Sequence, residues 1–424
     1  MSVSCAKHDL LYFIEREEKS MAKVLEGIRV LEWGMLQQGP VASALLADLG
    51  AEVIKIESLR GDNSRYITYF YGQESGLPGN STTYFESCNR NKKGITLDMK
   101  APEGRELLYK LVEKSDVFLT NFKPGTPEKL GAGYEDLKKI NPKIIYAYAT
   151  GLGLHGPDKD AALIDFIAMG RSGIMHSVGD VNDDRPGFIQ GAFCDQIGAM
   201  CTAFGVLAAL MARERHGMGQ LVEVNLLSAF SNLNWINVNQ FGWTHKAISR
   251  NNAKRPSNPL SNYYQCKDGK WIMLGAYLPK FIKDFFTIVD MPEIANDEKY
   301  TTQKGVAMDS EKLTGLVAEA MKTKDRAEWM QIFKEKGFMM GPINTYEELF
   351  EDPQMLENHG FYDLEYPGWD GPVKLVGAPF YLNETPCTIE KWAPKLGEDN
   401  ASVYGELCGV SAEELAVLKE KGII

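Results

Sequence analysis

The sequence predicts an α/β protein whose main body is a doubly wound, Rossmann-like parallel sheet. Buried-strand patterns alternate with helix patterns from residue 24 onward, and parallel strands require helical crossovers of this kind. Apolar residues make up 44% of the 424 residues, enough for a substantial core. A second run of strand and helix patterns follows a polar, Pro-bearing segment at 250–262, so we expect a smaller α/β domain as well.

The first strand–helix–strand unit is predicted over residues 27–57. The apolar stretch "GIRVLEW" (27–33) predicts a buried strand. A helix is expected over 39–50, because Pro40 suits a first helical turn and Gly50 suits a helix end. "AEVIKIE" (51–57) then predicts a second buried strand.

The same alternation continues through the next 170 or so residues. Residues 101–115 predict an amphipathic helix whose apolar side chains recur at helical spacing: Leu107, Leu108, Leu111 and Val112. A long buried helix is expected over 194–217, where basic residues and a glycine mark its end. The strands expected between and after these helices are "DVFLT" (116–120), "KIIYAYAT" (143–150) and "QLVEVNL" (220–226).

Four segments are predicted along the chain. They are an N-terminal extension (1–23), a large Rossmann-like domain (24–245), a smaller domain (246–345), and a linker with a C-terminal segment that returns to the large domain (346–424). Within the extension, either Met1 or Met21 is a possible native start.

Composition and residue spacing argue against several kinds of partner, metal site and cellular compartment. With 46 basic and 57 acidic residues the net charge is −11, which argues against general nucleic-acid binding. The seven cysteines form no CxxC pair and are odd in number, so we expect reduced thiols in a cytoplasmic protein rather than a disulfide framework or a zinc site. No histidines fall at metal-ligand spacing, and no run of 18 apolar residues predicts a membrane span.

A glycine motif, "GLGLHG" (151–156), follows a predicted strand and matches the dinucleotide fingerprint GxGxxG. It leaves open an NAD-dependent dehydrogenase. The fingerprint should open a helix, however, and here Pro157 and three charged residues come next. The alternative is a glycine turn that lets another group approach the backbone closely.

Asp165 stands where a loop of Gly, Pro and charge meets an apolar, helix-like stretch. Aspartate is favoured at helix N-caps, where its charge suits the positive end of the helix. An ionised carboxylate is also a nucleophile that needs no base to attack. The residues alone leave both roles open.

Two basic stretches, 89–93 and 121–131, stand out in this acidic chain. Local cation clusters at strand ends are where phosphates bind, and "NFKPG" (121–125) also leads into a predicted helix N-terminus. A stretch of this kind, taken alone, is more often a solvated surface.

Four ordered blocks together resemble the class III CoA-transferase family, which includes formyl-CoA, carnitine, bile-acid and phenyllactate CoA-transferases. The blocks are residues 25–57, 89–131, 140–157 and 164–173. The resemblance implies a two-domain chain and an interlocked, ring-like homodimer. It implies no tightly bound cofactor, because the substrates are a CoA thioester and a small carboxylic acid.

The resemblance also implies roles for individual residues. Asp165 matches the family's catalytic aspartate, which forms an aspartyl-CoA thioester. The sequence departs from the formyl-CoA enzyme at three places. Lys129 stands where that enzyme has an Arg, and Thr150 stands where it has a CoA-contacting Lys. The glycine-rich loop of that enzyme has no counterpart in residues 252–264. The CoA contacts that carry over lie near Gln37, Lys92, Asn121, Phe122 and Lys129.

An α-methylacyl-CoA racemase is the main alternative within this family. That branch has a His before the matching Asp, and here the position is Ile164, which cannot transfer a proton. Asp195 matches a racemase acid, but transferases commonly carry an acid there too. For the transferase we expect a 2-hydroxy or enoic acid of amino-acid fermentation as acceptor. Two roles are open for four apolar residues, lining an acyl pocket or packing in the ordinary core: Trp33, Met35, Phe166 and Met169.

Overall fold

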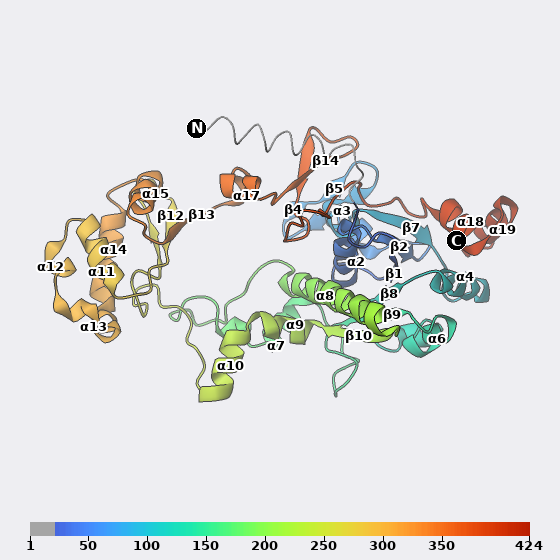
Figure 1. The fold of residues 1–424 in the computed structure, drawn as a ribbon, viewed down its shortest axis with the longest axis horizontal. Coiled ribbons are helices and arrows are strands. Elements are labelled where there is room, and N and C mark those ends of the chain that lie inside the picture. Colours follow the sequence, from blue (N-terminus) through green and yellow to red (C-terminus); the bar gives the residue numbers. More distant parts are fainter. Residues whose placement is uncertain (1–21) are drawn as a thin grey trace. The chain divides into compact units, whose positions relative to one another are not determined.

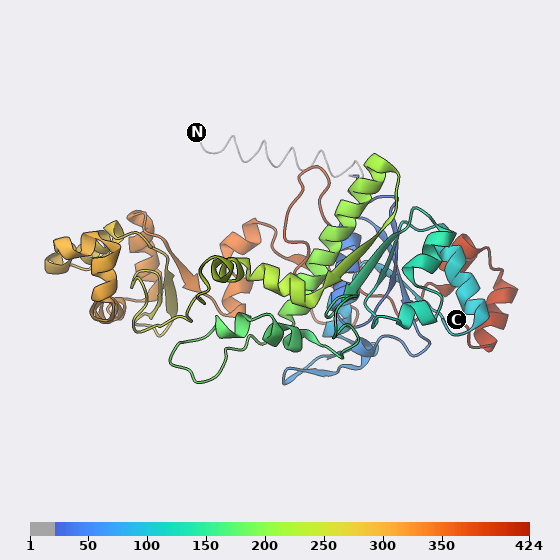
Figure 2. The same cartoon turned by 90° about the horizontal axis from the view of Figure 1, so that it is seen from below.

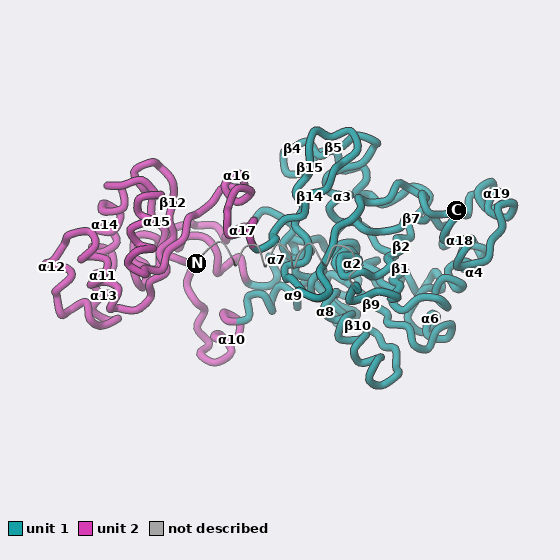
Figure 3. The backbone as a smooth tube through the Cα atoms, turned by 45° about the horizontal axis from the view of Figure 1, so that its top comes forward, with its two compact units in different colours: residues 1–173, 189–235, 358–424 teal, residues 174–188, 236–357 magenta. Residues whose placement is uncertain are grey.

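The computed structural model describes residues 22–424, drawn in Figure 1, and divides into two compact units, coloured separately in Figure 3. Unit 1 contains the chain up to Gly173 together with Ile189–Trp235 and Asn358–Ile424. Unit 2 contains Ile174–Phe188 and Ile236–Glu357. Two segments predicted for the large domain, 174–188 and 236–245, therefore group with unit 2, and all but the last two residues of the expected extension lie outside the described part.

The centre of unit 1 is a six-stranded sheet in which every neighbouring pair is parallel. The strand order is β10-β9-β8-β1-β2-β7, so the chain winds outward from β1 in one direction and then from β8 in the other. This order has its topological switch point between β1 and β8. The strands are β1 (Arg29–Trp33), β2 (Glu52–Glu57), β7 (Lys92–Thr96), β8 (Val117–Thr120), β9 (Ile145–Thr150) and β10 (Gln220–Asn225). The expectation of a parallel α/β sheet is confirmed.

Helices cover both faces of this sheet, because side chains alternate along each strand. Val30 of β1 belongs to the core under α2 (Gln38–Asp48) and α8 (Phe193–His216), whereas Leu31 belongs to the opposite core. That second core is closed by α4 (Pro102–Glu113), α6 (Tyr134–Ile140) and the penultimate helix α18 (Asn400–Cys408). Figure 2 shows the sheet edge-on between these two helix layers.

Most expected elements of unit 1 are present. The four apolar residues predicted for one face of α4 are all buried. The sequence "KKGIT" was assigned to a basic turn, so the strand β7 was not predicted. The strand β7 pairs with β2 at the edge of the sheet. The smaller elements of unit 1 are η1 (Asn63–Tyr66), β3 (Tyr69–Phe70), β4 (Gln73–Glu74), β5 (Gly76–Leu77), β6 (Ser81–Thr82), α3 (Thr83–Asn89), α5 (Thr126–Lys129), α7 (Asp165–Arg171), α9 (Leu226–Leu233), β14 (Tyr362–Glu365), β15 (Pro372–Leu375) and α19 (Ala412–Glu420).

Unit 2 has its own core beneath a three-stranded antiparallel sheet with the order β11-β12-β13. Stacked aromatic rings fill that core, among them Phe285, Trp329 and Phe333. Its elements are η2 (Ile174–His176), β11 (Tyr263–Gln265), β12 (Trp271–Leu274), α11 (Lys280–Ile288), α12 (Pro292–Ala295), η3 (Glu298–Thr301), α13 (Gln303–Met308), α14 (Ser310–Met321), α15 (Arg326–Glu335), β13 (Met340–Ile343), α16 (Tyr346–Phe350) and α17 (Pro353–Glu357). Helix α10 (Trp235–Thr244) begins at the boundary between the units.

Helix α8 is long and apolar enough to cross a membrane, judged by length and composition alone. Its buried side chains, such as Ala199 and Val206, pack in the core against α2 and the sheet. Core helices commonly have this composition, so this is weak evidence for a span, and the absence of one stays a prediction.

Candidate active site

The loops after β1 and β8 meet at the switch point of the sheet, where open α/β sheets bind ligands. Asn121, directly after β8, joins them. Its Oδ1 accepts a hydrogen bond from the Met35 N–H at 2.9 Å, and its Nδ2 donates to the Met35 carbonyl at 2.8 Å. A Cβ on Gly34 would approach Asn121 Oδ1 to 2.8 Å, so the close contact of the two loops requires glycine there.

A cavity of about 190 Å³ opens beside these loops, at the carboxyl ends of β1 and β2. Phe122 packs against Trp33 in its wall, with ring centroids 4.4 Å apart. Exposed Lys100 also lines it. Two aromatic faces with a cation beside them are suited to a planar, partly apolar group that carries negative charge nearby. Of the residues predicted to contact CoA, only Phe122 lines this cavity.

Asp165 is the first residue of α7, and the residue before it, Ile164, makes no side-chain cap. Its carboxylate instead caps a different helix. Oδ2 accepts a hydrogen bond at 2.9 Å from the N–H of Asp195, in the first turn of α8, and the N–H of Cys194 also bonds this carboxylate. Oδ1 is buried and has no hydrogen-bond partner among residues 22–424. One carboxylate oxygen is thus held while the other stays unpaired.

Burial and the N-terminus of α8 have opposite effects on the ionisation of Asp165. Asp165 is 6% exposed, and burial raises its pKa, while the hydrogen bonds from Asp195 and Cys194 N–H groups act in the opposite direction. The N-terminal dipole of α8 also favours the ionised form. A carboxylate in this position is poorly hydrated but oriented, which is what a nucleophile requires.

Asp195 brings a second carboxyl group to the same helix start. Burial and the charge of Asp165 raise the pKa of Asp195 to about 7. The carboxyl group of Asp195 therefore retains its proton in weakly acidic solution.

Gln37 connects the switch-point loop to the start of α8. Its Nε2 donates to the carbonyl of Ala192, the residue before α8, at 3.3 Å. Its Oε1 accepts from the Tyr84 hydroxyl at 3.2 Å. Tyr84 also experiences the charge of Asp195, which, after burial, helps to raise its pKa. Tyr84 was missed by sequence reasoning, and its only signal was its place in a polar, aromatic stretch.

Lys92, a predicted CoA contact, is surrounded by protein groups. Its side chain is fully buried, and its ammonium group has four oxygen neighbours within 2.8–3.1 Å. Burial lowers its pKa to about 8, opposed by the carboxylate of Glu32. The other two cations of this stretch are also paired, Arg90 with Asp48 and Lys93 with Glu52. Residues 89–93 therefore form ion pairs within the fold rather than a free phosphate site.

Lys129 is exposed at the end of the short helix α5, beyond the carboxyl end of β8. Lys123, in the turn before α5, is exposed too. The second basic stretch thus keeps its cations available to an anion. Its turn uses Gly125 in a left-handed conformation (φ 84°).

The glycine motif at 151–156 opens no helix, since the next helix, α7, begins at Asp165. Gly153 and Gly156 have positive φ values, and a Cβ on Gly151 would meet the Leu163 side chain at 2.7 Å. The motif is a tight turn that allows close packing, as the alternative interpretation expected, and it does not form a dinucleotide fingerprint.

The four residues considered for an apolar acyl pocket are dispersed. Trp33 and Met35 line the cavity at the sheet edge, Met169 is fully buried, and Phe166 is 45% exposed. They do not form one pocket.

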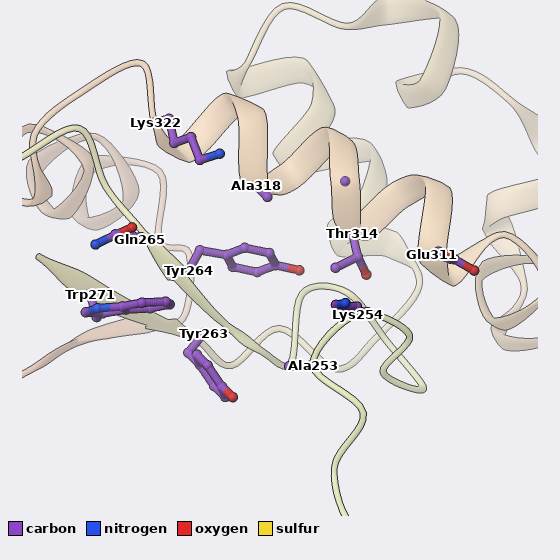
Figure 4. A pocket seen from close by; sticks show the side chains of 11 residues that line it. Ala253, Lys254, Tyr263, Tyr264, Gln265, Trp271, Glu311, Thr314, Ala318 and Lys322 are labelled. Atoms are coloured by element: carbon purple, nitrogen blue, oxygen red, sulfur yellow. The ribbon is translucent and has the colours of Figure 1, made fainter. Parts of the chain in front are cut away.

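A larger cavity, about 470 Å³, lies within unit 2 along the edge strand β11 and the helix α14 (Figure 4). Tyr263 and Trp271 form one wall, and Lys254 and Lys322 lie at its margins. None of the predicted site residues lines it. Among residues 22–424, no group of three or more His, Cys, Asp or Glu is placed to hold a metal ion.

Comparison with known proteins decides the family. Residues 25–400 match the model of CoA-transferase family III. The chain belongs to this family. The transferase is 31% identical to a succinyl-CoA–D-citramalate CoA-transferase of Chloroflexus aurantiacus, over 94% of this chain and 98% of the relative. It is 30% identical to an (R)-2-hydroxy-4-methylpentanoate CoA-transferase of Clostridioides difficile, over 95% of this chain and 99% of the relative.

The fold of this CoA-transferase is shared with solved structures. A CAIB/BAIF family protein from Brucella suis superposes with a TM-score of 0.81 at 31% identity, covering 91% of this chain and 99% of that one. The transferase therefore is an enzyme that uses CoA thioesters, and the resemblance identified from the sequence is confirmed.

Proposed function

We propose that this transferase moves CoA from an acyl-CoA donor to a carboxylic acid through a thioester on Asp165. The observation that carries the proposal is the buried carboxylate at the start of α8, with one oxygen held and the other unpaired. A carboxylate acceptor and a thioester donor exchange groups without net oxidation, hydrolysis or proton transfer, so a nucleophilic carboxylate is sufficient.

The steps follow from the chemistry of the carboxylate. Asp165 attacks the acyl thioester carbon, the C–S bond breaks, and an acyl–aspartyl anhydride and CoA thiolate result. The thiolate attacks the aspartyl carbonyl carbon, which releases the donor acid and leaves an aspartyl-CoA thioester. The acceptor carboxylate attacks that thioester to give a second anhydride. The thiolate then attacks its acyl carbonyl, which releases the new acyl-CoA and free Asp165.

The start of α8 supports these steps electrostatically. The N–H groups that bond the Asp165 carboxylate are those of Asp195 and Cys194. When the aspartyl carbonyl carbon is attacked, negative charge returns to its oxygen, and the same N–H groups stabilise it. Gln37 and Tyr84 are placed to orient groups beside this helix start.

The CoA nucleotide is proposed to occupy the cavity at the carboxyl ends of β1 and β2. Phe122 and Trp33 offer apolar ring faces, and exposed Lys100 and Lys129 offer positive charge for phosphates. Lys92 is omitted from this proposal, because its ammonium is already surrounded by protein oxygens.

The acceptor is proposed to be a 2-hydroxy or enoic acid with an aryl or branched side chain. Support comes from relatives at 30–31% identity whose names specify 2-hydroxy acids, (R)-2-hydroxy-4-methylpentanoate and D-citramalate. Redox chemistry is not needed for such an exchange, and no NAD site is proposed at "GLGLHG".

The enzyme is proposed to act as an interlocked homodimer in the cytoplasm. Apolar side chains lie exposed on α8 and α10, including Phe204 (75% exposed) and Trp243 (87% exposed), and a second copy of the chain is proposed to cover them.

The proposed compartment is supported by the cysteines. Those in the described part of the chain are free thiols, in keeping with a reducing compartment.

Trapping the intermediate tests the reaction. Enzyme would be incubated with a panel of acyl-CoAs, treated with hydroxylamine or borohydride, and measured by intact mass and peptide mapping. An adduct on Asp165 that is absent from Asp165→Asn supports the proposal. Asp158→Asn is the matched control, because Asp158 is an exposed acid paired with Arg171 and should leave the adduct intact.

The same samples distinguish the alternatives. If no thioester gives an adduct but the α-proton of a 2-methylacyl-CoA exchanges with deuterium, the racemase replaces the transferase. Turnover-linked change in near-UV absorbance with NADH would instead indicate a dehydrogenase.

A further inference from the structure

The loop between β1 and α2 is held by three polar side chains from different parts of unit 1, of which Lys55 and Asp62 are buried and Asn121 is half-buried. Lys55 Nζ donates to the Gly34 carbonyl at 3.2 Å. Asn121 bonds both the N–H and the carbonyl of Met35. The N–H of Leu36 donates to Asp62 Oδ1 at 3.2 Å. Every residue from 34 to 36 thus has its backbone fixed from outside the loop.

Leu36 is the unusual residue of this loop. Its φ of 64° is in the left-handed region, which residues with a Cβ disfavour. Its side chain is 38% exposed, so apolar burial alone does not account for this conformation. A disfavoured backbone conformation persists only where its surroundings enforce it. The hydrogen bond to Asp62 is the contact that reaches Leu36 itself.

Asp62 is built to provide that contact. It is 1% exposed, and its Oδ1 also accepts from the N–H and the hydroxyl of Ser64, at 2.9 and 2.8 Å. Its Oδ2 lies 3.0 Å from Lys55 Nζ, and Lys55 in turn pairs with Glu32 at 3.2 Å. The charge of Lys55 opposes the effect of burial and keeps the pKa of Asp62 below its usual value, so the acceptor stays ionised.

The residue that follows Leu36 is Gln37, which contacts Ala192 at the start of α8 and Tyr84. The direction in which the Gln37 side chain leaves the backbone depends on the conformation at Leu36. Gly34, Met35 and Asp62 also line the cavity at the sheet edge. The buried carboxylate of Asp62 therefore contacts both the proposed nucleotide cavity and the loop whose Gln37 reaches the start of α8.

We infer that Asp62 is a positioning residue of the transfer reaction, which holds Leu36 in its left-handed conformation and so directs Gln37 to the start of α8. The inference rests on the proposed function, since Asp165 at that helix is its nucleophile. Asp62 itself touches no reacting atom in this role.

The test compares five variants with the wild type: Asp62→Ala, Asp62→Asn, Asp62→Ala with Leu36→Gly, Asp62→Ala with Asp290→Gly, and Asp48→Asn. Asn at 62 keeps the Oδ1 acceptor. Gly at 36 adopts a positive φ without the penalty of a Cβ. Asp290, also left-handed (φ 56°), lies in unit 2, and Asp48 is a buried acid paired with Arg90 away from this loop. For each, kcat, KM for acyl-CoA and the thermal midpoint would be measured at equal folded enzyme.

We expect Asp62→Ala to lower kcat about ten- to hundredfold, the range that follows from misplacing a catalytic group by a fraction of an ångström to an ångström. Asp62→Asn should lose less, and Leu36→Gly should restore several-fold of the loss, whereas Asp290→Gly should restore none. Asp48→Asn should lower the thermal midpoint without changing kcat. Equal loss of kcat in Asp62→Ala and Asp48→Asn, or no restoration by Leu36→Gly, would overturn the inference. Absence of any Asp165 adduct in the wild type would instead overturn the proposed function.

Discussion

The Asp195 N–H donates to Asp165 Oδ2 at 2.9 Å, so the first residue of one helix caps the start of another. From the sequence, capping and catalysis are compatible explanations of Asp165, with the cap expected on the helix that starts at this residue. The structure places the carboxylate at the N-terminus of α8, where the helix dipole and two N–H groups favour its charge. The same contact therefore serves as a cap and, in the proposed mechanism, orients the nucleophile.

Replacing Asp165, the proposed nucleophile, should separate these two roles. Asp165→Asn keeps an oxygen that can accept from α8, and Asn is as good a cap as Asp. We expect the thermal midpoint to change little while transfer activity falls by about a thousandfold or more, since no covalent intermediate forms. Asp165→Ala should lose the cap as well, at about 1 kcal/mol of stability. Calorimetry and steady-state assays check both, and near-normal activity in Asp165→Asn would contradict the mechanism.

The raised pKa of Asp195 predicts a pH dependence of stability. In the unfolded chain this group ionises near pH 3.9, whereas in the folded protein its pKa is about 7. Between these values the folded state keeps a proton that the unfolded state has lost, so stability falls as pH rises from about 4 to about 7. The loss is at most about 4 kcal/mol.

Asp195→Asn should remove this dependence. We expect the variant to be more stable than the wild type at pH 8 and nearly equal to it at pH 4. Denaturant unfolding at fixed protein concentration, at both pH values, measures the difference. No gain at pH 8 would show that the burial and charge of this pair are less costly than the structure indicates.

Ionised Asp195 should also affect the acceptor. The acceptor is an anion, and above about pH 7 the second carboxylate near Asp165 adds repulsion. We expect kcat/KM for the acid to fall above pH 7 in the wild type and to stay level in Asp195→Asn. A profile that is unchanged by the substitution would place the acceptor away from this pair.

If the proposed nucleotide cavity binds CoA, substituting a residue of its wall should weaken the binding of acyl-CoA. Phe122→Ala removes one of two packed rings, and aromatic faces that stack on a base contribute about 1–3 kcal/mol. KM for acyl-CoA should rise about tenfold or more while kcat changes less. Phe281→Ala in unit 2 is the control for losing a partly buried ring and should leave KM unchanged.

Lys92→Met tests whether Lys92 contacts CoA. Removing a buried charge leaves Glu32 with Lys55 as its remaining cation partner, and breaking a buried pair costs about 3–5 kcal/mol. We expect a large loss of stability and no change in KM for acyl-CoA at equal folded enzyme. A raised KM with unchanged stability would favour the CoA contact that the sequence predicted.

The sequence predicted well what depends on local pattern. The strands around Val30 and Ile54 and the buried face of α4 follow from spacing of apolar residues, which is a local property. Asn121 and Phe122 lie directly after β8, beside the switch point of the sheet, and their contacts with CoA stay predictions.

What the sequence did not show depends on contacts between distant residues. Lys92 looked like a surface cation, because nothing near it in the chain reveals that Glu32 and Pro40 lie against its ammonium. Tyr84 and the cap of α8 by Asp165 arise from pairings across about 30 to 50 residues. Side-chain pattern carries no information on such pairings.

The cap on α8 has a consequence for turnover. In the proposed mechanism Asp165 becomes an anhydride and then a thioester, both uncharged, and a neutral carbonyl is a weaker acceptor for the N–H groups of Cys194 and Asp195. The first turn of this 24-residue helix should therefore loosen and tighten once in each catalytic cycle. Amide hydrogen exchange at its first residues would then report, in real time, what fraction of the enzyme is covalently loaded.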